Sequence, residues 1–488
     1  MRNDDTIFAL ASGFGRAAIA VIRLSGPDAE TVLRALLRGA LPAARHASLR
    51  RLHDPASGEI LDQALVLWLP GPGSFSGEDQ AELHIHGGVA VRGAVVAALS
   101  RLPGCRAAEP GEFTRRAFLN GRLDLSAVEG LADLIDAETE GQRRQAMRQL
   151  EGALAREVAS WRERLIDASA HLEAALDFTD EEDVPADIVA AALSGLRGVR
   201  EHVAAALADG ARGERLREGV VVVIAGPPNA GKSTLLNALA RRDVAIVSPV
   251  AGTTRDSIEV RCDLSGLPVT FVDTAGLRDT ADPLEHAGIE RTRAHMGAAD
   301  LVLWLRPADG GPISEPHPEV LGQSPSLEGG LQSSLEDPSR LASQAPQDEG
   351  EPVVRDGPTT ERGDAFAAPT LTVITKADLA DAPAETCSAL AISAQTGLGL
   401  DRLIERVRSE AEARLSGGDA LITRERHRVA LEEVVAALGR ADTMLQAGHE
   451  ELAAEDVRLA LRALGRITGR VDVEEVLDRI FGQFCIGK

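Results

Sequence analysis

The chain of 488 residues contains no tyrosine, and aromatic side chains make up only 3% of it. Proteins that bind single-stranded nucleic acid usually stack its bases on aromatic side chains, so this sequence is poorly supplied for that mode of binding. Its four cysteines, Cys105, Cys262, Cys387 and Cys485, are far apart and form no Cys-x-x-Cys pair. We therefore expect neither a disulfide framework nor a zinc site, and the sparse cysteines are typical of the cytoplasm.

Positive charge is also scarce, because 52 Lys and Arg stand against 75 Asp and Glu and give a formal net charge of −23. That balance argues against a protein that grips nucleic acid through a broad basic surface. Long hydrophobic runs are missing too: Ala64–Leu69 and Val220–Ala225 have the length of a strand, so no membrane span is expected. The charged N-terminus lacks the apolar stretch of a signal peptide.

The sequence pattern changes three times along the chain and predicts a multidomain protein, part α/β and part all-α. Residues 1–121 and 217–412 alternate strand and helix patterns, whereas residues 122–216 and 413–488 have helical spacing. The simplest architecture is one helical domain in two segments with a Ras-like nucleotide domain inserted between them. In the N-terminal part, the expected strands are Ala17–Leu24, Ala64–Leu69 and Gln80–Ile85, and the expected helices are Ala29–Leu37 and Val91–Leu102. Ser126 and Glu129 predict a capping box where the helical segment begins.

Residues 308–368 interrupt the nucleotide domain with a different composition. They are rich in Pro, Ser, Gly and Glu, and hold twelve Asp or Glu against three Arg. Such a segment cannot bury enough apolar surface to offset the entropy lost on ordering. We expect a disordered insertion between the strands Leu301–Leu305 and Leu371–Ile374, tolerated at the surface. A docking or shielding arm is the alternative.

The segment Gly226–Ser233 reads Gly-Pro-Pro-Asn-Ala-Gly-Lys-Ser and follows the apolar run Val220–Ala225. In a strand, turn and helix context, its glycines let backbone N–H groups approach phosphates. Lys232 then reaches the β and γ oxygens, and Ser233 offers a hydroxyl to Mg²⁺. The sequence therefore predicts a phosphate-binding loop.

Further motifs follow in the order that a GTPase requires, each at the end of an expected strand or in a loop. The motif Gly252–Asp256 supplies a threonine for Mg²⁺, and Asp273–Gly276 supplies a carboxylate for Mg²⁺ and an N–H for the γ-phosphate. In the motif Thr375–Asp378, Asp378 accepts two hydrogen bonds from guanine, and a backbone N–H of Ser393-Ala394 meets the guanine oxygen. Thr375 replaces the usual asparagine and offers fewer hydrogen bonds.

The catalytic group is less evident from the residues. Leu277 occupies the position where many small GTPases carry a water-orienting glutamine. Asn229 can donate an oxygen to a monovalent cation beside the phosphates, which would supply positive charge there. Glu285 can orient water if its loop folds back, although its spacing alone favours a solvated acid. Arg255 and Arg278 are alternative charge donors.

Taken together, these motifs resemble the TrmE-type G domain, whose motifs are shared in part with ribosome-assembly GTPases. The ends of the chain favour one family. The C-terminal Phe484–Lys488 is similar to the Cys-x-Gly-Lys signature of the MnmE (TrmE) family of tRNA-modification GTPases. The N-terminal segments that also match are Asp5–Ile7, Ile22–Gly26, Phe75–Asp79, His86–Gly88 and Pro110–Gly121. The resemblance covers nearly the whole chain except residues 308–368.

The resemblance implies a cytoplasmic homodimer that pairs its G domains and hydrolyses GTP in a potassium-dependent way. With an FAD-containing partner, MnmG, the family forms a heterotetramer. That complex installs a carboxymethylaminomethyl group at C5 of the wobble uridine of certain tRNAs. The N-terminal domain, by the same resemblance, is an α+β folate-binding and dimerisation domain. It holds a 5-formyl or 5,10-methylene tetrahydrofolate as the one-carbon source.

The resemblance also assigns residues to these sites. The folate contacts are Arg23, Glu82, Arg122 (usually Lys) and Lys488. The K⁺ ligands are Asn229, Ser248 (often Thr), Val250 and Thr253, and the Mg²⁺ ligands are Ser233 and Thr254. Glu285 matches the water-activating glutamate, and Cys485 is a candidate functional thiol. The full set assigned to GTP is Asn229, Ala230, Gly231, Lys232, Ser233, Thr234, Ser248, Pro249, Val250, Ala251, Gly252, Thr253, Thr254, Asp273, Thr274, Ala275, Gly276, Thr375, Lys376, Ala377, Asp378, Ser393 and Ala394.

Two other functions remain open at this point. One is a ribosome-assembly or regulatory GTPase that acts as a switch. The other is a folate-dependent one-carbon enzyme whose G domain only regulates it. The absence of a basic GXXG module after the G domain and the C-terminal Cys-Ile-Gly-Lys both favour tRNA modification.

Overall fold

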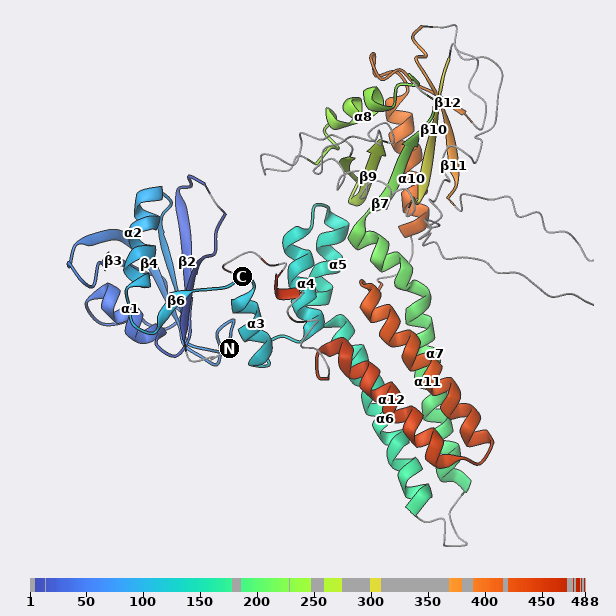
Figure 1. Ribbon diagram of the computed structural model, residues 1–488, viewed down its shortest axis with the longest axis horizontal. Helices are drawn as coiled ribbons and strands as arrows, with labels where there is room; N and C mark the ends of the chain where they lie inside the picture. The colour runs from blue at the N-terminus through green and yellow to red at the C-terminus, as the bar shows by residue number, and fades with distance from the viewer. Residues whose placement is uncertain are drawn as a thin grey trace, which may run out of the picture. The chain divides into compact units, whose positions relative to one another are not determined.

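The structure is a computed structural model. It describes residues 5–13, 15–177, 186–227, 229–246, 259–273, 299–308, 368–379, 389–415 and 420–471, and positions 477, 480–482, 484 and 487. The chain forms two compact units. The first comprises Met1–Val220, Cys262–Val269 and Arg408–Lys488, and the second comprises Val221–Arg261 and Thr270–Val407. The second unit is thus inserted within the first, which confirms the predicted architecture of an interrupted helical part and an inserted α/β part (Figure 1).

The N-terminal part contains a six-stranded sheet in the order β3-β4-β5-β2-β1-β6. Leu83 and Ile85 of β5 are buried beneath α1 and α2, whereas the residues between them face the other side of the sheet. This alternation is the reason that the apolar pattern predicted strands here. The strands are β1 Thr6–Leu10, β2 Ile19–Ser25, β3 Ser48–His53, β4 Ile60–Leu69, β5 Gln80–His86 and β6 Cys105–Ala107, and the helices are α1 Ala29–Leu37, α2 Val89–Ser100 and α3 Glu112–Leu119.

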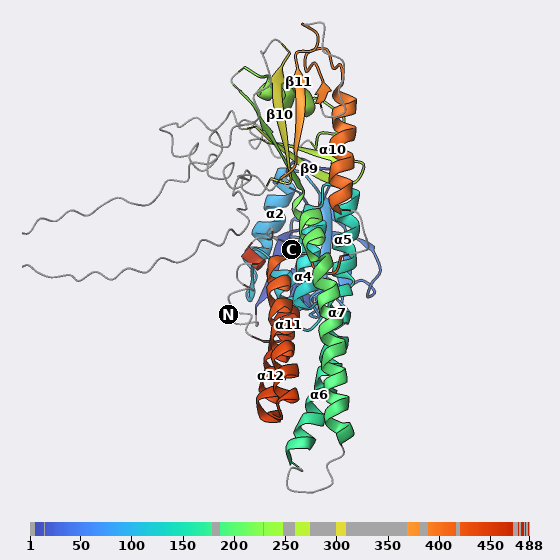
Figure 2. The same cartoon turned by 90° about the vertical axis from the view of Figure 1, so that its right-hand side faces the viewer.

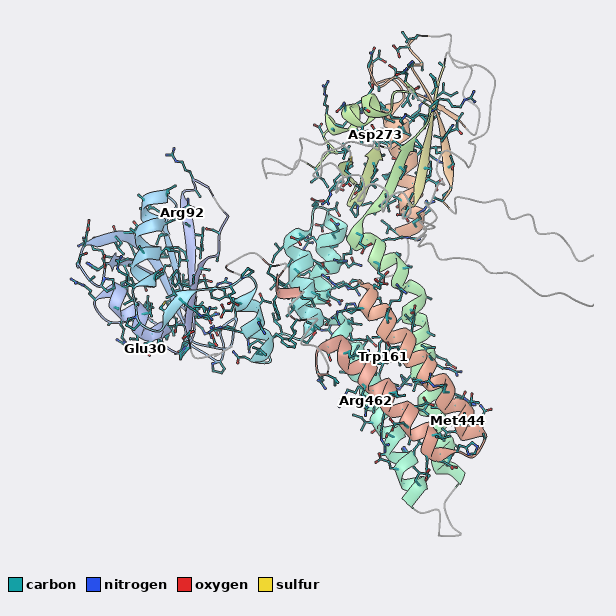
Figure 3. The ribbon with its side chains drawn as sticks, in the orientation of Figure 1. Glu30, Arg92, Trp161, Asp273, Met444 and Arg462 are labelled. Atoms are coloured by element: carbon teal, nitrogen blue, oxygen red, sulfur yellow. The ribbon has the colours of Figure 1, made fainter. Side chains whose placement is uncertain are left out.

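Four long helices pack as a bundle, in which each of α6, α7, α11 and α12 contacts two of the others (Figures 1 and 2). Two of them precede the inserted unit and two follow it, so the core joins residues far apart in the sequence. Trp161, labelled in Figure 3, is 2% exposed in this core beside Leu196, Val434 and Leu464. The helices of this part are α4 Leu125–Asp136, α5 Glu140–Leu150, α6 Ala153–Asp177, α7 Ala186–Glu218, α11 Glu425–Gln446 and α12 Glu450–Thr468.

The predicted capping box of Ser126 and Glu129 is wrong. Helix α4 begins after Asp124, whose carboxylate accepts the Ala127 N–H at 3.0 Å and the Ser126 hydroxyl at 2.5 Å. Glu129 therefore lies one and a half turns inside the helix, too far along to reach back to the cap. Its buried carboxylate binds residues of α11 instead.

The inserted unit contains a second six-stranded sheet in the order β12-β11-β10-β7-β9-β8. Strands β7, β10, β11 and β12 run parallel, and the two-residue turn Ser265-Gly266, with both φ angles positive, joins β8 to β9 as a tight hairpin. The strands that follow β7 in the sequence lie first on one side of it, as β8 and β9, and then on the other side, as β10. The strand order therefore reverses beside β7, and the loop after β7 lies at a topological switch point. The elements are β7 Val220–Ala225, α8 Lys232–Ala240, β8 Glu259–Leu264, β9 Leu267–Asp273, β10 Leu301–Pro307, β11 Thr370–Thr375, β12 Ala389–Ala391 and α10 Leu400–Leu415.

The strands expected in the nucleotide domain are confirmed at β7, β9, β10 and β11. The expected disordered insertion lies outside the described residues from 309 to 367. Among the helices that the structure describes, none combines the length and the apolar composition that a membrane crossing requires.

Candidate functional site

The loop after β7 has the backbone that phosphate binding requires. Gly226 adopts a φ of 150°, and a Cβ there would lie 2.5 Å from the Leu305 carbonyl oxygen, so only glycine fits beside β10. Asn229 and Gly231 hold φ angles of 62° and 91°, and they turn the chain into α8. The free N–H groups at the start of α8 can then point at an anion, as the sequence predicted.

Lys232 is the first residue of α8 and its side chain arches back over the loop. Its ammonium donates to the carbonyl oxygens of Gly226 at 2.9 Å and of Pro227 at 3.1 Å. In phosphate-binding loops of this sequence, the lysine ammonium contacts the β and γ phosphates of a nucleotide. The Lys232 ammonium is held next to the loop by these two hydrogen bonds.

Ser233 and Asp273 come together although 40 residues separate them in the sequence. Asp273, labelled in Figure 3, is 3% exposed at the end of β9, and its Oδ2 accepts the Ser233 hydroxyl at 2.6 Å. A hydroxyl and a carboxylate oxygen are hard donors of the kind that Mg²⁺ prefers. The donor set therefore fits a magnesium ion beside the phosphate loop.

Thr375 links the expected guanine-reading loop to the phosphate loop. Its buried hydroxyl donates to the Ala230 carbonyl oxygen at 2.7 Å and lies 3.3 Å from that of Arg306. Lys376 follows with a φ of 58°, and the Ala377 N–H donates to the Ile392 carbonyl at 3.0 Å. These contacts fix the loop and leave Asp378 exposed at its tip.

Ser393 and Ala394 follow β12 at the same edge of the sheet. The Ser393 N–H donates to the Leu398 carbonyl at 2.9 Å, and its hydroxyl oxygen accepts the Thr396 N–H at 3.2 Å. Ser393 is thus occupied in shaping its own loop. Of the two predicted residues, Ala394 offers the backbone N–H that can meet a guanine oxygen.

Several predicted site residues lie outside the described part of the chain. Of the four expected K⁺ ligands, the structure describes Asn229. The expected catalytic residue Glu285 lies outside the described residues. The other predicted site residues that lie outside them are Ser248, Pro249, Val250, Ala251, Gly252, Thr253, Thr254, Thr274, Ala275, Gly276, Cys485 and Lys488.

A second polar site occupies the N-terminal sheet. Arg23 of β2 and Glu82 of β5 are cross-strand neighbours and form an ion pair at 3.2 Å. The Arg23 guanidinium lies 5.7 Å from the ring centroid of Phe75 and 5.9 Å from that of Phe113. His84 Nε2 lies 3.2 Å from the other Glu82 oxygen. Sequence reasoning missed the two phenylalanines, although both lie in segments that carry the family resemblance.

The C-terminal segment reaches the same sheet. Gly487 holds a φ of 103°, and a Cβ there would lie 2.3 Å from the Leu10 carbonyl oxygen of β1. Leu10 adjoins Ala9, whose cross-strand partner is Arg23. The structure therefore brings the end of the chain close to the Arg23–Glu82 pair, which spacing alone did not show.

Arg122, the third expected folate contact, lies beside the loop that carries Phe75. It is exposed, and its Cγ would be 3.3 Å from a Cβ on Gly77. Behind this loop, the buried Arg116 guanidinium binds Glu78 at 3.1 Å and Glu112 at 3.0 Å. Buried ion pairs of this kind hold a loop in one conformation, because removing either partner leaves an uncompensated charge.

A buried ionic cluster on α4 was also missed, because its members are about 300 residues apart. Glu129 accepts two hydrogen bonds of 2.5 Å from Arg426 and one of 2.9 Å from His427. Burial raises the pKa of Glu129, but His427 and Arg426 outweigh it and hold that pKa well below its usual value. One turn later, Asp133 Oδ1 binds Arg217 at 3.0 Å and Arg424 at 2.6 Å.

Comparison with known proteins identifies the family. The family model described as MnmE helical domain matches residues 125–485, and that described as GTP-binding protein TrmE N-terminus matches residues 6–122. The tRNA modification GTPase MnmE of Methylobacterium sp. (strain 4-46) is 57% identical, over 99% of this chain and 100% of its own. The chain belongs to the MnmE family of tRNA modification GTPases.

A more distant MnmE from Rhodospirillum rubrum is 49% identical over 99% of each chain. Among solved structures, Aquifex aeolicus Era bound to GDP and aluminium fluoride is 25% identical over 44% of this chain and 66% of its own. Its TM-score is 0.23. Membership in the MnmE family confirms a GTPase in tRNA modification, rather than a GTPase of ribosome assembly.

Proposed function

We propose that this MnmE-family chain couples GTP hydrolysis in its inserted unit to a one-carbon transfer supported by its N-terminal domain. The observation that carries the proposal is the presence of both sites in one chain. One is the Ser233–Asp273 pair beside a phosphate loop. The other is the Arg23–Glu82 pair, which the chain's own C-terminal segment approaches at Gly487.

In the nucleotide site, Lys232 would neutralise the phosphates, and Mg²⁺ would be held by Ser233 and Thr254 directly and by Asp273 through water. Thr375 positions the loop so that Asp378 reads guanine. K⁺ would be held by Asn229 with Ser248, Val250 and Thr253, and bound there it supplies positive charge as phosphoryl oxygens gain negative charge. Asn229 fits this role because its left-handed backbone places an amide side chain on the phosphate loop itself. Glu285 would orient the attacking water.

The second site suits a tetrahydrofolate derivative of the 5-formyl or 5,10-methylene kind. Glu82 offers a carboxylate to the amino and N–H groups of a pterin, and the exposed Arg122 with Lys488 offers cations to an anionic glutamate tail. Phe75 and Phe113 provide ring faces beside Arg23. When bound, the folate supplies the carbon unit.

The face of the N-terminal sheet opposite α1 and α2 supports a homodimer through this domain. Leu49 and Leu65 are cross-strand neighbours there and are 59% and 38% exposed, and Ile19 is 60% exposed. Leu65 pairs with His84 and Glu82 with Arg23, so this apolar surface is continuous with the proposed folate site. A second copy of the chain packed on this face would bury the apolar surface and cover the proposed folate site.

The remaining steps extend the proposal beyond this chain. An FAD-containing partner of the MnmG type, in a cytoplasmic heterotetramer, would complete the carboxymethylaminomethyl group at C5 of the wobble uridine. Within the chain we propose boundaries at 1–121, 122–216, 217–412 and 413–488. Cys485, two residues before Gly487 in the sequence, is a candidate functional thiol.

The decisive experiment compares GTP hydrolysis by the full chain in potassium and in sodium at equal ionic strength. We expect at least about tenfold faster hydrolysis in potassium, a difference of about 1.4 kcal/mol in activation free energy, and its loss in Asn229→Ala. Thr370→Ala, an exposed change at the start of β11, is the matched control. Equal slow rates in both salts would instead favour a switch that waits for a protein activator.

Folate binding is tested separately. We expect Arg23→Ala and Glu82→Gln each to weaken binding of 5-formyltetrahydrofolate, measured by calorimetry, by tenfold or more. Arg101→Ala removes an exposed, ion-paired arginine of the same domain and should change nothing. Equal affinity in all three variants would place the folate elsewhere.

A further inference from the structure

Residues 31–53 are a local exception to the acidic balance of the chain. They contain five arginines, two histidines and no Asp or Glu, in a chain of net charge −23. They span most of α1, the connection after it, and β3, the edge strand of the N-terminal sheet. Four of these arginines are exposed, and none of the four has an ion-pair partner among the described residues. We call them the arginine ridge: Arg38, Arg45, Arg50 and Arg51.

The ridge follows the edge of the sheet. Arg50 and Arg51 lie in the middle of β3, which pairs with β4 alone. The Arg38 guanidinium lies against Gly58, just before β4 begins, within 2.5 Å of where a Cβ would be. The Arg45 N–H donates to the Trp68 carbonyl at 2.7 Å, near the other end of β4. The four arginines are therefore spread along about 20 Å of edge, the length of a six-residue strand. Arg50 and Arg51 face opposite sides of β3, and the Arg45 guanidinium lies against Gly73.

No carboxylate among the described residues lies within ion-pair distance of the ridge arginines. Three nearby carboxylates already have other partners, and Glu59, next to Gly58, is exposed. The three pairs are Glu30 with Arg34 at 2.7 Å, Asp54 with Arg101 at 2.8 Å, and Asp62 with His86 at 2.8 Å. The edge thus presents more positive than negative charge.

Two ridge residues also hold a costly backbone conformation. Arg38 and Arg45 have φ angles of 52° and 63°, in the left-handed region. The other described non-glycine residues with positive φ are Asn229 and Lys376 in the nucleotide site and Ser265 in a hairpin turn. Arg38 holds this conformation as the residue that ends α1, where its N–H bonds the Arg34 carbonyl oxygen. At Arg45 the conformation persists because the surrounding structure over-determines it.

We propose that the arginine ridge binds the phosphate backbone of the tRNA that this family modifies. Guanidinium groups pair with phosphate through two parallel hydrogen bonds, and a row of them matches a polyanionic strand. The acidic remainder of the chain repels RNA, so the ridge would also select the orientation in which tRNA approaches. The proposal rests on the proposed function in one respect, that the RNA is a tRNA. Arginines on an edge strand can also serve to prevent strand pairing between molecules, which the test separates.

The experiment measures binding of the full chain to an unmodified tRNA transcript by fluorescence anisotropy at several KCl concentrations. The ridge variant carries Arg38→Gln, Arg45→Gln, Arg50→Gln and Arg51→Gln. The matched control loses the same charge at four exposed, ion-paired arginines: Arg143, Arg144, Arg440 and Arg458, each changed to Gln. A third variant, Arg50→Glu with Arg51→Glu, keeps the edge strand charged.

We expect the ridge variant to bind at least tenfold more weakly and to flatten the salt slope by about 3, since each phosphate contact contributes about 0.7–0.9. The Glu variant should also bind weakly, and the control should bind as the unmodified chain does. Equal losses in ridge variant and control, or an unchanged salt slope, would overturn the proposal. Normal tRNA binding by the Glu variant together with aggregation of the ridge variant would also overturn it, because the arginines would then serve to prevent strand pairing. An affinity for phosphatidylglycerol vesicles that depends on the ridge, without any for tRNA, would overturn it as well. Potassium-stimulated GTP hydrolysis should be unchanged in every variant, so a failed ridge leaves the proposed function standing.

Discussion

Thr375 shows how one hydroxyl can replace an asparagine in the loop that we propose reads guanine. Such a loop must be tied to the phosphate loop for base and phosphates to be bound in a fixed relation. The Thr375 hydroxyl makes that link to the Ala230 carbonyl at 2.7 Å while remaining 4% exposed. The position needs one donor in a small buried space, and threonine supplies it.

Replacing Thr375 by valine should therefore weaken guanine nucleotide binding about fivefold. The change keeps the shape and removes a hydrogen bond worth about 1 kcal/mol, which corresponds to that factor in affinity. Fluorescence titration with a labelled GDP measures it. Thr375→Ser should retain affinity, and Thr370→Val, at an exposed position of the same strand, is the control. A valine variant with unchanged affinity would show that the link is dispensable.

His427 is a completely buried imidazole whose Nε2 lies 2.9 Å from the Glu129 carboxylate. Burial lowers the pKa of His427 in spite of the nearby carboxylate. The neutral ring can donate from Nε2, and its buried Nδ1 has no hydrogen-bond partner. A lone pair without a donor costs less than a buried N–H without an acceptor, so the neutral form fits the cluster.

The stability of the bundle should fall as pH drops below about 6.5, the ordinary pKa of histidine. The unfolded chain binds a proton there and the folded chain does not, so up to about 1.4 kcal/mol is lost per pH unit. Glu129 adds no slope in this range, because its lowered pKa keeps it ionised. Urea unfolding followed through Trp161, with Trp68 and Trp304 changed to Phe, measures the slope. His427→Gln should reduce this dependence of the unfolding free energy on pH. The same dependence in the variant would show that His427 is not the group responsible.

At the scale of elements, the C-terminal segment is held on the N-terminal sheet by close backbone contact. Gly487 adopts a φ of 103° and lies so close to Leu10 that no side chain fits. Only glycine combines this conformation with this approach. The signature Cys-x-Gly-Lys thus has a structural reason for its glycine.

Gly487→Ala should displace the tail and weaken binding of 5-formyltetrahydrofolate by tenfold or more. Potassium-stimulated GTP hydrolysis should be unaffected. Gly482→Ala is the control, since a Cβ there meets nothing within 4 Å. Digestion with carboxypeptidase gives a readout that needs no folate, and the Gly487→Ala tail should be removed faster. Identical digestion of both variants would show that the contact does not hold the tail.

At the scale of the whole molecule, the two segments of the helical part meet at one carboxylate. Arg217, at the end of α7, and Arg424, just before α11, bind the same oxygen of Asp133 at 3.0 and 2.6 Å. The end of α7 and the start of α11 are therefore neighbours, although about 200 residues separate them. A bundle can thus be completed by helices on both sides of an insertion.

Excising residues 219–419 and joining the ends with about eight Gly and Ser residues should leave a folded N-terminal domain and helical bundle, with Ile422 retained in the bundle core. Such a linker spans roughly 25 Å, more than two arginine side chains meeting on one carboxylate require. We expect normal burial of Trp161 by fluorescence and retained binding of 5-formyltetrahydrofolate, with no GTP binding. A chain with exposed Trp161 would show that the bundle depends on the inserted unit.

The sequence by itself determined the features that arise from contiguous residues. Strand and helix periodicity, the phosphate loop and the order of the GTPase motifs depend on spacing within a few residues, and the family signatures are short as well. The Ser126–Glu129 prediction failed because both residues suit a cap, and only a distant partner, Arg426, decided where Glu129 points.

The tertiary structure alone decided which distant residues meet. It brought Ser233 to Asp273, Thr375 to Ala230 and Gly487 to Leu10. It also placed the arginine ridge along one edge and brought Arg217 and Arg424 together on Asp133. These contacts depend on the path of the chain between their partners, and residue spacing carries no information about that path. Their stability comes from burial and charge pairing that exist only once the core has formed.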